Sequence, residues 1–167
     1  MEIYYTKNEL KSVDFLKTVL DYKGISVDLT NIEISAHGKP FIKDLEFDFN
    51  LSHTKNMTAC VIGKNVGIDC QEIKSVRTVV IERVCSENDI QKINKAQDKE
   101  LEFARLWSFK EAYTKMIGSG FRYSFKNTNI ENAFCLHPYI KIYQKLIDNT
   151  ILTAVEENSQ VAKITQI

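Results

Sequence analysis

The sequence predicts an α+β fold made of two similar lobes, each with a helix packed on a small antiparallel sheet. Its 167 residues are enough for one domain, or for two small lobes that share a core. A helix followed by three strand-like segments occurs twice along the chain, and no linker or shift in composition separates the two halves. We therefore expect an N-terminal lobe at 1–84 and a C-terminal lobe at 85–167 that share an interface.

The N-terminal half is expected to contain one long helix at about 9–22, where apolar residues recur at helical spacing. Asn8 is a candidate N-cap for this helix, and Gly24 ends it. A shorter helix is expected at 79–84, and His37-Gly38-Lys39-Pro40 reads as a turn. Strand-like segments fill the rest of this half. They lie at 3–6, 32–35, 47–51, 57–62 and 66–71.

The C-terminal half is expected to begin with two helices. Ser86 and the acidic residues after it indicate the capped start of a short helix that ends near Lys95. A long helix follows at about 99–117, and Gly118 closes it. The chain then returns to strands, with Asp148-Asn149 as a turn between two of them. These strands are expected at 128–132, 139–146, 150–155 and 161–165.

Composition excludes several classes of protein. The 22 basic and 22 acidic residues give a formal net charge of +0, whereas nucleic-acid binders usually carry a basic excess. No apolar run approaches the roughly 20 residues that a membrane helix needs, and the N-terminus shows no signal peptide. The four cysteines are widely spaced, which argues against a zinc or redox motif. We therefore expect a cytoplasmic protein with reduced thiols that binds neither nucleic acid nor membrane.

A polar residue ends the apolar strand expected at 66–71. On a strand, Asp69 and Gln71 point to one face and Cys70 and Glu72 to the opposite face. Gly67 permits close approach of another backbone to this strand. An Asp in such a position is as often a turn-former as a metal ligand, so the segment alone leaves both roles open.

The long helix carries three residues along one stripe. Trp107, Glu111 and Lys115 are spaced i, i+4 and i+8 and therefore lie on one face. A Glu–Lys pair at this spacing is usually a solvated surface pair. The large apolar ring of Trp107 on the same stripe indicates instead that the stripe faces protein or a ligand cleft.

Two further segments could bind an anion. Ser52-His53-Thr54 places a histidine between two hydroxyl residues at the end of a strand, where the ring can donate to a negative group. The alternative is a structural histidine near a turn, whose ring is already hydrogen-bonded within the protein. Gly38-Lys39-Pro40 is a turn that presents a lysine, and on its own it has little specificity.

Taken in order, the motifs G-K-P, N-L-S-H-T, G-I-D-x-x-E and W-x-x-K-E-A-x-x-K resemble the 4′-phosphopantetheinyl transferase superfamily. The long segment before Asp69 is similar to the surfactin-synthetase-activating (Sfp) type, a pseudo-twofold pair of lobes with the active site between them. The resemblance implies transfer of 4′-phosphopantetheine from coenzyme A to a serine of an apo acyl or peptidyl carrier protein. The reaction is that of holo-[acyl-carrier-protein] synthase; it needs Mg²⁺, or Mn²⁺, and releases 3′,5′-ADP.

The resemblance also assigns roles to individual residues. Asp69 and Glu111 match the carboxylate ligands of the metal, which a magnesium ion prefers. Glu111 also matches the general base for the carrier serine, and Lys115 matches the residue that contacts phosphate and assists the leaving group. The residues that match contacts to coenzyme A are Lys39, Pro40, Ser52, His53, Lys110, Lys115 and Lys7.

The sequence departs from the family pattern at two places. Gln71 stands where the metal strand usually has its second carboxylate, so the metal site would be less negative. The stretch before Gly38 is short, and only Lys7 is roughly in register with the basic residues that bind the 3′-phosphate of coenzyme A. Two other functions stay open. A weak or inactive module that binds carrier protein or coenzyme A would fit Gln71, and another metal-dependent phosphoryl enzyme would leave the S-H and G-K-P turns without a role.

The expected partner is an apo carrier protein that docks on a monomeric enzyme near the cleft between the lobes. Candidate surfaces are the segment 84–99 and the helix that starts near Val79. Carrier proteins are generally acidic, but this chain has no net positive charge. Docking should therefore depend on apolar contact or a local basic strip more than on long-range electrostatic steering.

Overall fold

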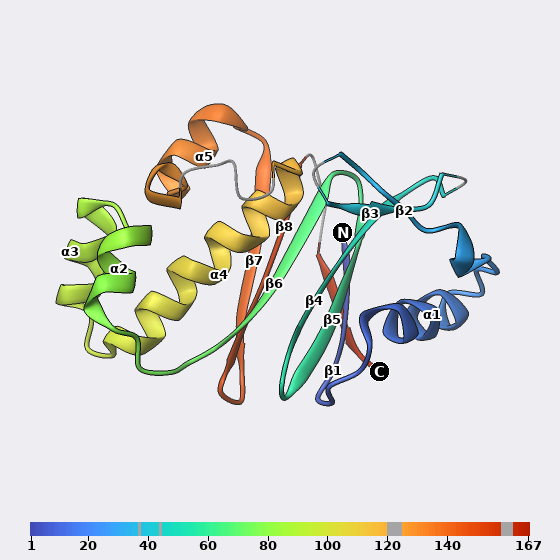
Figure 1. The fold of residues 1–167 in the computed structure, drawn as a ribbon, viewed down its shortest axis with the longest axis horizontal. Coiled ribbons are helices and arrows are strands. Elements are labelled where there is room, and N and C mark those ends of the chain that lie inside the picture. The colour runs from blue at the N-terminus through green and yellow to red at the C-terminus, as the bar shows by residue number, and fades with distance from the viewer. Residues whose placement is uncertain (37, 44, 120–124, 158–161) are drawn as a thin grey trace.

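The computed structural model describes residues 1–36, 38–43, 45–119, 125–157 and 162–167 (Figure 1). Within these residues the chain is an α+β protein with a four-stranded sheet, a three-stranded sheet and a short two-stranded ribbon. None of the described helices is long and apolar enough to cross a membrane. The ribbon pairs β2 (Glu33–Ile34) with β3 (Pro40–Phe41), and a 3₁₀ turn η1 (Leu29–Asn31) precedes it.

The four-stranded sheet has the order β4-β5-β1-β9 and contains both ends of the described chain. Its strands are β1 (Glu2–Thr6), β4 (Asp48–Thr54), β5 (Met57–Gly63) and β9 (Lys163–Gln166). The pairs β1–β5 and β4–β5 are antiparallel, whereas β9 pairs parallel with β1. The last strand of the chain therefore completes the sheet that the first strand began.

The three-stranded sheet has the order β6-β8-β7, and all its pairs are antiparallel. Its strands are β6 (Val66–Glu72), β7 (Ile140–Ile147) and β8 (Thr150–Glu157). Asp148 has a positive φ of 51° in the turn between β7 and β8, as the expected Asp148-Asn149 turn requires. In this sheet β6 lies at an edge, so one side of its backbone has no strand partner there.

The two sheets lie between helix α1 (Ser12–Tyr22) on one side and helix α4 (Lys99–Ile117) on the other (Figure 1). The alternation of β1 explains this arrangement, because successive side chains point to opposite faces. Tyr4 packs with Phe15 and Leu16 of α1, whereas Ile3 packs with Ile68 of β6. The core between the sheets thus contains residues from both of them.

Capping residues define the helices of the C-terminal half. Helix α2 (Thr78–Val84) is followed by α3 (Glu87–Lys95), whose N-cap Ser86 forms a reciprocal capping box with Asp89. Helix α4 begins after Asp98, whose side chain accepts from the Leu101 N–H, and ends at Gly118 in the left-handed conformation. These boundaries confirm the expected start of α3 and both ends of α4.

The sequence-based prediction is wrong at two elements. Residues 128–132, expected to form a strand, lie at the start of helix α5 (Ile130–Leu136), because the Asn129 side chain caps it by accepting from the Asn132 N–H. Helix α1 begins at Ser12 rather than near residue 9, since residues 8–10 hydrogen-bond to Thr58 of β5. Asn8 is therefore not the N-cap; Lys11 occupies that position without a side-chain bond.

The repeated unit also differs from the expected helix followed by three strands. In each of the two larger sheets, a first strand is followed by helical segments and then by a hairpin. The first strand pairs with the second strand of that hairpin, so β1 pairs with β5 and β6 pairs with β8. The β6–β8 pair crosses the expected lobe boundary at 84/85. The division into lobes 1–84 and 85–167 stays a prediction. Expected features at His37 and residue 161 lie outside the described residues.

Candidate active site

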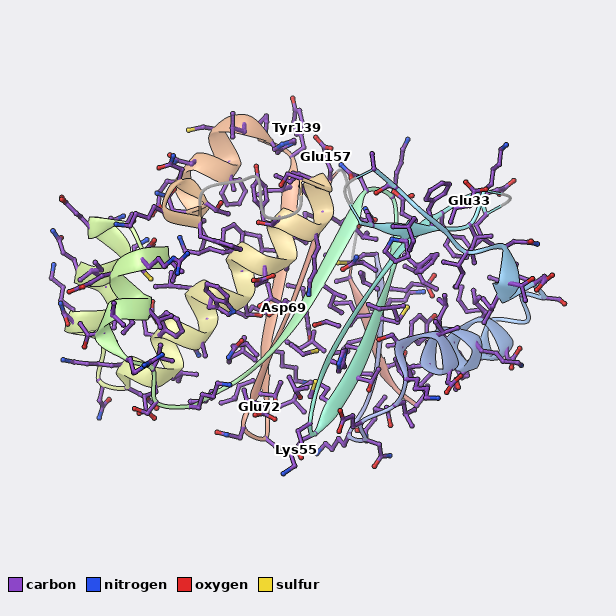
Figure 2. The ribbon with its side chains drawn as sticks, in the orientation of Figure 1. Glu33, Lys55, Asp69, Glu72, Tyr139 and Glu157 are labelled. Carbon is purple, nitrogen blue, oxygen red and sulfur yellow. The ribbon has the colours of Figure 1, made fainter. Side chains whose placement is uncertain are left out.

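The candidate site is built where strand β6 crosses helix α4, and Gly67 makes that crossing possible. A Cβ at Gly67 would overlap the Ala112 carbonyl oxygen and the Met116 amide nitrogen of α4. Only a glycine therefore allows the two backbones to come this close. Gly67, Asp69 and Gln71 share one face of the strand, so the close crossing brings Asp69 beside α4 (Figure 2).

Asp69 is buried and uses only part of its hydrogen-bonding capacity within the protein. Only 6% of the surface of Asp69 is exposed to solvent. Oδ1 accepts from Lys115 Nζ at 2.8 Å and from Ser52 Oγ at 3.2 Å. Oδ2 is buried and has no hydrogen-bond partner among the described residues. A buried, unpartnered carboxylate oxygen is the kind of group that a bound cation satisfies.

Glu111 lies one helical turn before Lys115 and lines a cavity of about 260 Å³ together with it; we call this the Glu111 cavity. Burial raises the pKa of Glu111, and the negative charge of Asp69 raises it further, while Lys115 partly offsets both effects. The two carboxylates are thus near enough to repel one another. A divalent cation between them would remove that repulsion.

Lys115 holds the site together. Its ammonium donates to Asp69 Oδ1 at 2.8 Å, to the Ile68 carbonyl at 3.0 Å and to Ser52 Oγ at 3.3 Å. All three acceptors lie on β4 or β6, so one side chain of α4 bridges two strands of different sheets. The ammonium therefore stands next to the candidate metal ligand, where a phosphate group would meet a fixed positive charge.

The outer edge of β6 is closed by side chains instead of a neighbouring strand. The Ile68 N–H donates to Asn50 Oδ1 at 3.0 Å, and the Cys70 N–H donates to Ser52 Oγ at 3.1 Å. The Val66 carbonyl accepts from Lys39 Nζ at 3.0 Å. Every one of these side chains also lines a cavity beside Asp69 or Glu111.

A second cavity, of about 510 Å³, adjoins the first and contains His53, so we call it the His53 cavity. Pro40, Leu51 and Lys115 line both cavities. Asp69 and Ser52 line the His53 cavity, and Lys39 lines the Glu111 cavity, where burial lowers the pKa of its ammonium despite the opposing charge of Asp48. The structure therefore places the G-K-P turn, the S-H pair and both carboxylates around two cavities that share part of their lining.

The residues present fit a metal ion held by two carboxylates. Asp69 offers its unpartnered Oδ2, and its negative charge adds to burial in raising the pKa of Glu111, which places the second carboxyl group nearby. Gln71 lies two residues after Asp69, but its Nε2 donates to the Glu72 carbonyl at 2.9 Å. No cluster of three His, Cys, Asp or Glu side chains suited to a metal occurs among the described residues.

Two residues expected at the coenzyme A site lie elsewhere. Lys110 is buried on another face of α4, where its ammonium binds Asp89 and two backbone carbonyls. Lys7 forms an exposed ion pair with Asp148, at 2.8 Å between Nζ and Oδ2. The structure therefore does not bring Lys110 or Lys7 together with Asp69, Glu111 and Lys115.

Sequence reasoning missed Asn50 and Phe125, which both line the Glu111 cavity. Asn50 had a usable signal, because it precedes Ser52 by two residues and so shares its face of the strand. Phe125, in the 3₁₀ turn η3 (Phe125–Asn127), stacks on Trp107 with ring centroids 5.1 Å apart. Nothing in the spacing of the sequence indicates that contact.

The chain is similar in sequence to known proteins over more than half of its length. A family model described as the 4′-phosphopantetheinyl transferase superfamily matches residues 65–165, which is more than half of the chain. The 4′-phosphopantetheinyl transferase psf-1 of Bacillus pumilus is 37% identical over 95 residues, covering 54% of this chain and 41% of that protein. The 4′-phosphopantetheinyl transferase gsp of Aneurinibacillus migulanus is 38% identical over 87 residues, covering 50% and 36%.

The structure of Thermotoga maritima holo-[acyl-carrier-protein] synthase aligns with a TM-score of 0.47 and 22% identity, over 56% of this chain and 63% of that chain. The chain thus matches less than half the length of the two curated relatives. The matched segment nevertheless runs from the start of β6 through α4 to β9, and so contains Asp69, Glu111 and Lys115. The chain belongs to the 4′-phosphopantetheinyl transferase superfamily.

Proposed function

We propose that this chain transfers 4′-phosphopantetheine from coenzyme A to a serine hydroxyl of an apo acyl or peptidyl carrier protein and releases 3′,5′-ADP. The observation that carries the proposal is the buried Asp69 carboxylate, which has one oxygen bound to Lys115 and the other unpartnered, beside Glu111. Membership of the superfamily supports the choice of reaction.

In this reaction the serine oxygen forms a bond to the phosphorus that carries pantetheine, and the bond from that phosphorus to the oxygen of 3′,5′-ADP breaks. Glu111 is suited to accept the serine proton, directly or through water, because its raised pKa makes it a stronger base than an exposed carboxylate. Lys115 is suited to hold the phosphate groups and to neutralise the charge that appears on the leaving oxygen.

We propose Mg²⁺, with Mn²⁺ as a substitute, as the metal that Asp69 and Glu111 hold, with Gln71 on the same face of β6 contributing an amide oxygen. A magnesium ion would neutralise the diphosphate and withdraw electron density from the reacting phosphorus. Lys39, Pro40, Ser52 and His53 would bind the nucleotide end of coenzyme A, because they line the adjoining cavities.

We further propose that the protein acts as a cytoplasmic monomer. Asp69, Glu111 and Lys115 come together within one chain, which supports this proposal. The four cysteines are unpaired, which fits a reducing compartment. For docking of the carrier we retain the segment 84–99 and the helix that starts near Val79 as the candidate surface, and Val79 is 62% exposed.

The test incubates the protein with coenzyme A, Mg²⁺ and an apo carrier protein, and then measures the intact mass of the carrier. A gain of one phosphopantetheine group supports the proposal. Asp69→Ala and Glu111→Ala should lower the rate by about 100-fold or more, while the exposed Glu100→Ala on the same helix should not. Binding of coenzyme A without a gain in mass would favour a non-catalytic binding module, and hydrolysis without modification of the carrier would favour a hydrolase.

A further inference from the structure

The W-x-x-K-E motif of α4 divides its residues between two faces of the helix. Glu111 lines the Glu111 cavity, whereas the side chain of Lys110 is 1% exposed and points into the protein. We propose, resting on the function above, that Lys110 is a positioning residue: together with Trp107 it fixes Phe125 as the wall of the Glu111 cavity, and it makes no contact with coenzyme A.

The hydrogen bonds of Lys110 leave no donor for a phosphate. An ammonium group has three N–H donors. Lys110 Nζ donates to Asp89 Oδ2 at 2.9 Å, to the Phe125 carbonyl at 2.6 Å and to the Thr128 carbonyl at 2.7 Å. A contact with coenzyme A would break one of these bonds and would draw a buried ammonium away from the carboxylate that balances its charge.

Phe125 is held from two directions by the same motif. Its ring stacks on Trp107 with centroids 5.1 Å apart and an interplanar angle of 28°, and its carbonyl accepts from Lys110. Trp107 in turn stacks on Phe103, with ring centroids 6.2 Å apart, so a second ring restrains it. Since Phe125 lines the same cavity as Glu111 and Lys115, these contacts set the position of a wall that faces the reacting groups.

Asp89 connects this wall to helix α3. Its Oδ2 accepts from both Lys110 Nζ and the Ser86 N–H that begins α3. Burial raises the pKa of Asp89, but the hydrogen bonds from Lys110 and Ser86 outweigh burial and leave the pKa below its ordinary value. The carboxylate is therefore charged at neutral pH, and the ammonium stays anchored while its two remaining bonds hold the segment 125–128.

The main test replaces the pair together, as Asp89→Leu with Lys110→Met, because removing one partner would leave a buried charge unpaired. Trp107 is the one tryptophan of the chain, so its emission reports directly on the contact with Phe125. We expect the folded double variant to show red-shifted emission without coenzyme A, and kcat/KM for transfer to fall by roughly 10- to 100-fold.

A double-mutant cycle with Phe125→Ala distinguishes positioning from direct binding. If Lys110 acts through Phe125, Phe125→Ala should add little to the loss in the Asp89→Leu/Lys110→Met protein. Unchanged emission of that folded variant, or losses in kcat/KM that multiply, would overturn the proposal. The emission is measured without substrate, so it tests the positioning role even if the carrier gains no mass and the proposed reaction fails.

A milder variant covers the case in which the double variant does not fold. Asp89→Asn keeps the lysine and leaves an amide oxygen that still accepts from it, so the anchor is weakened rather than removed. Under the positioning role this variant should red-shift Trp107 and raise KM for coenzyme A. A lysine that bound phosphate would instead be released toward the ligand, so an unchanged or lower KM would contradict the proposal. Lys17→Met is the matched control, because it removes an exposed ion pair with Asp21 far from this wall and should change neither readout.

Discussion

At the scale of single residues, Asp69 shows how one carboxyl group can be both a structural and a chemical element. Its Oδ1 receives hydrogen bonds from Lys115 and Ser52, which fix the orientation of the side chain. Its Oδ2 is left without a partner among the described residues. A buried oxygen without a hydrogen-bond partner lowers the free energy of unfolding, and binding of the proposed cation would remove that cost.

Glu111→Gln should stabilise the protein without metal. Burial and Asp69 raise the pKa of Glu111 above its ordinary 4.5, so its charge costs folding free energy at neutral pH. Below pH 4.5 the group is neutral in both folded and unfolded states, and the gain from Gln should vanish; it should develop as pH rises through the folded pKa. Thermal melts at several pH values in the absence of metal measure this gain in stability. Each kcal/mol of added stability should raise the Tm by about 2–4 °C.

The same variant should lose its response to magnesium. Melts with added Mg²⁺ should raise the Tm of the wild type but not that of Glu111→Gln, whereas Glu100→Gln should behave like the wild type. Equal Mg²⁺ responses in all three proteins would show that Glu111 is not a ligand.

Gln71→Glu should tighten the binding of magnesium. The added carboxylate would stand on the same face of β6 as Asp69, and a further unit of negative charge strengthens a cation site. We expect the Kd for Mg²⁺, measured by calorimetry, to fall by at least about tenfold, which corresponds to 1.4 kcal/mol. Glu72 lies on the opposite face of the strand, so Glu72→Gln should leave Kd unchanged. If Kd were the same in Gln71→Glu, Gln71 would lie outside the metal site.

Helix periodicity placed Glu111 and Lys115 on one stripe, and the resemblance to the superfamily added Asp69 to them. The structure brings these three side chains together. It could not predict what Lys110 faces. Helical spacing shows that Lys110 lies off the Glu111 stripe, but its partners Asp89 and Phe125 are far away in sequence and unmarked by any pattern. The nearness of Phe125 to Glu111 depends on the same tertiary packing.

At the scale of elements, the crossing of β6 and α4 depends on the missing side chain of Gly67. Gly67→Ala should destabilise the fold by about 3 kcal/mol or more, since the new methyl group would overlap two backbone atoms that cannot move independently. Gly24→Ala is the control: its Cβ would meet no atom, and only its positive φ of 70° should cost about 1 kcal/mol. Urea denaturation measures both; similar losses would refute the close crossing.

Elements with strong local signals were predicted well, and α5 was not. Ser86 and Gly118 act through their own neighbours in the chain, so the start of α3 and the end of α4 could be read directly. At 128–132, threonine and isoleucine favour a strand, yet the hydrogen bond from the Asn132 N–H to the Asn129 side chain caps a helix there. Propensity is a weak guide where a single capping bond is decisive.

At the scale of the whole molecule, the core between the sheets joins the two halves of the chain. Ile3 and Val61 of the four-stranded sheet pack in one cluster with Ile68 and Leu152 of the three-stranded sheet. The repetition of elements suggested two lobes, but no pattern in the sequence shows that β9 pairs with β1 or that β6 pairs with β8. Such pairings join segments far apart in the chain and depend on the packed core.

The shared core predicts that the protein unfolds in one step. Trp107 fluorescence reports on α4, whereas far-ultraviolet circular dichroism reports on both sheets, and the two urea transitions should coincide. Hydrogen exchange should give Ile3 and Leu152 amides the same free energy of opening. Separate transitions, with the four-stranded sheet lost first, would indicate two independent lobes.

The closed edge of β6 has a consequence for solubility. An edge strand with free N–H and carbonyl groups is a template on which another chain can add a strand. Here Lys39, Asn50, Ser52 and Lys115 occupy those groups at Val66, Ile68 and Cys70. Four side chains that line the candidate active site therefore also cover this edge. Substituting Lys39, Asn50, Ser52 or Lys115 to probe catalysis should also expose a strand edge on which a second copy of the chain can associate.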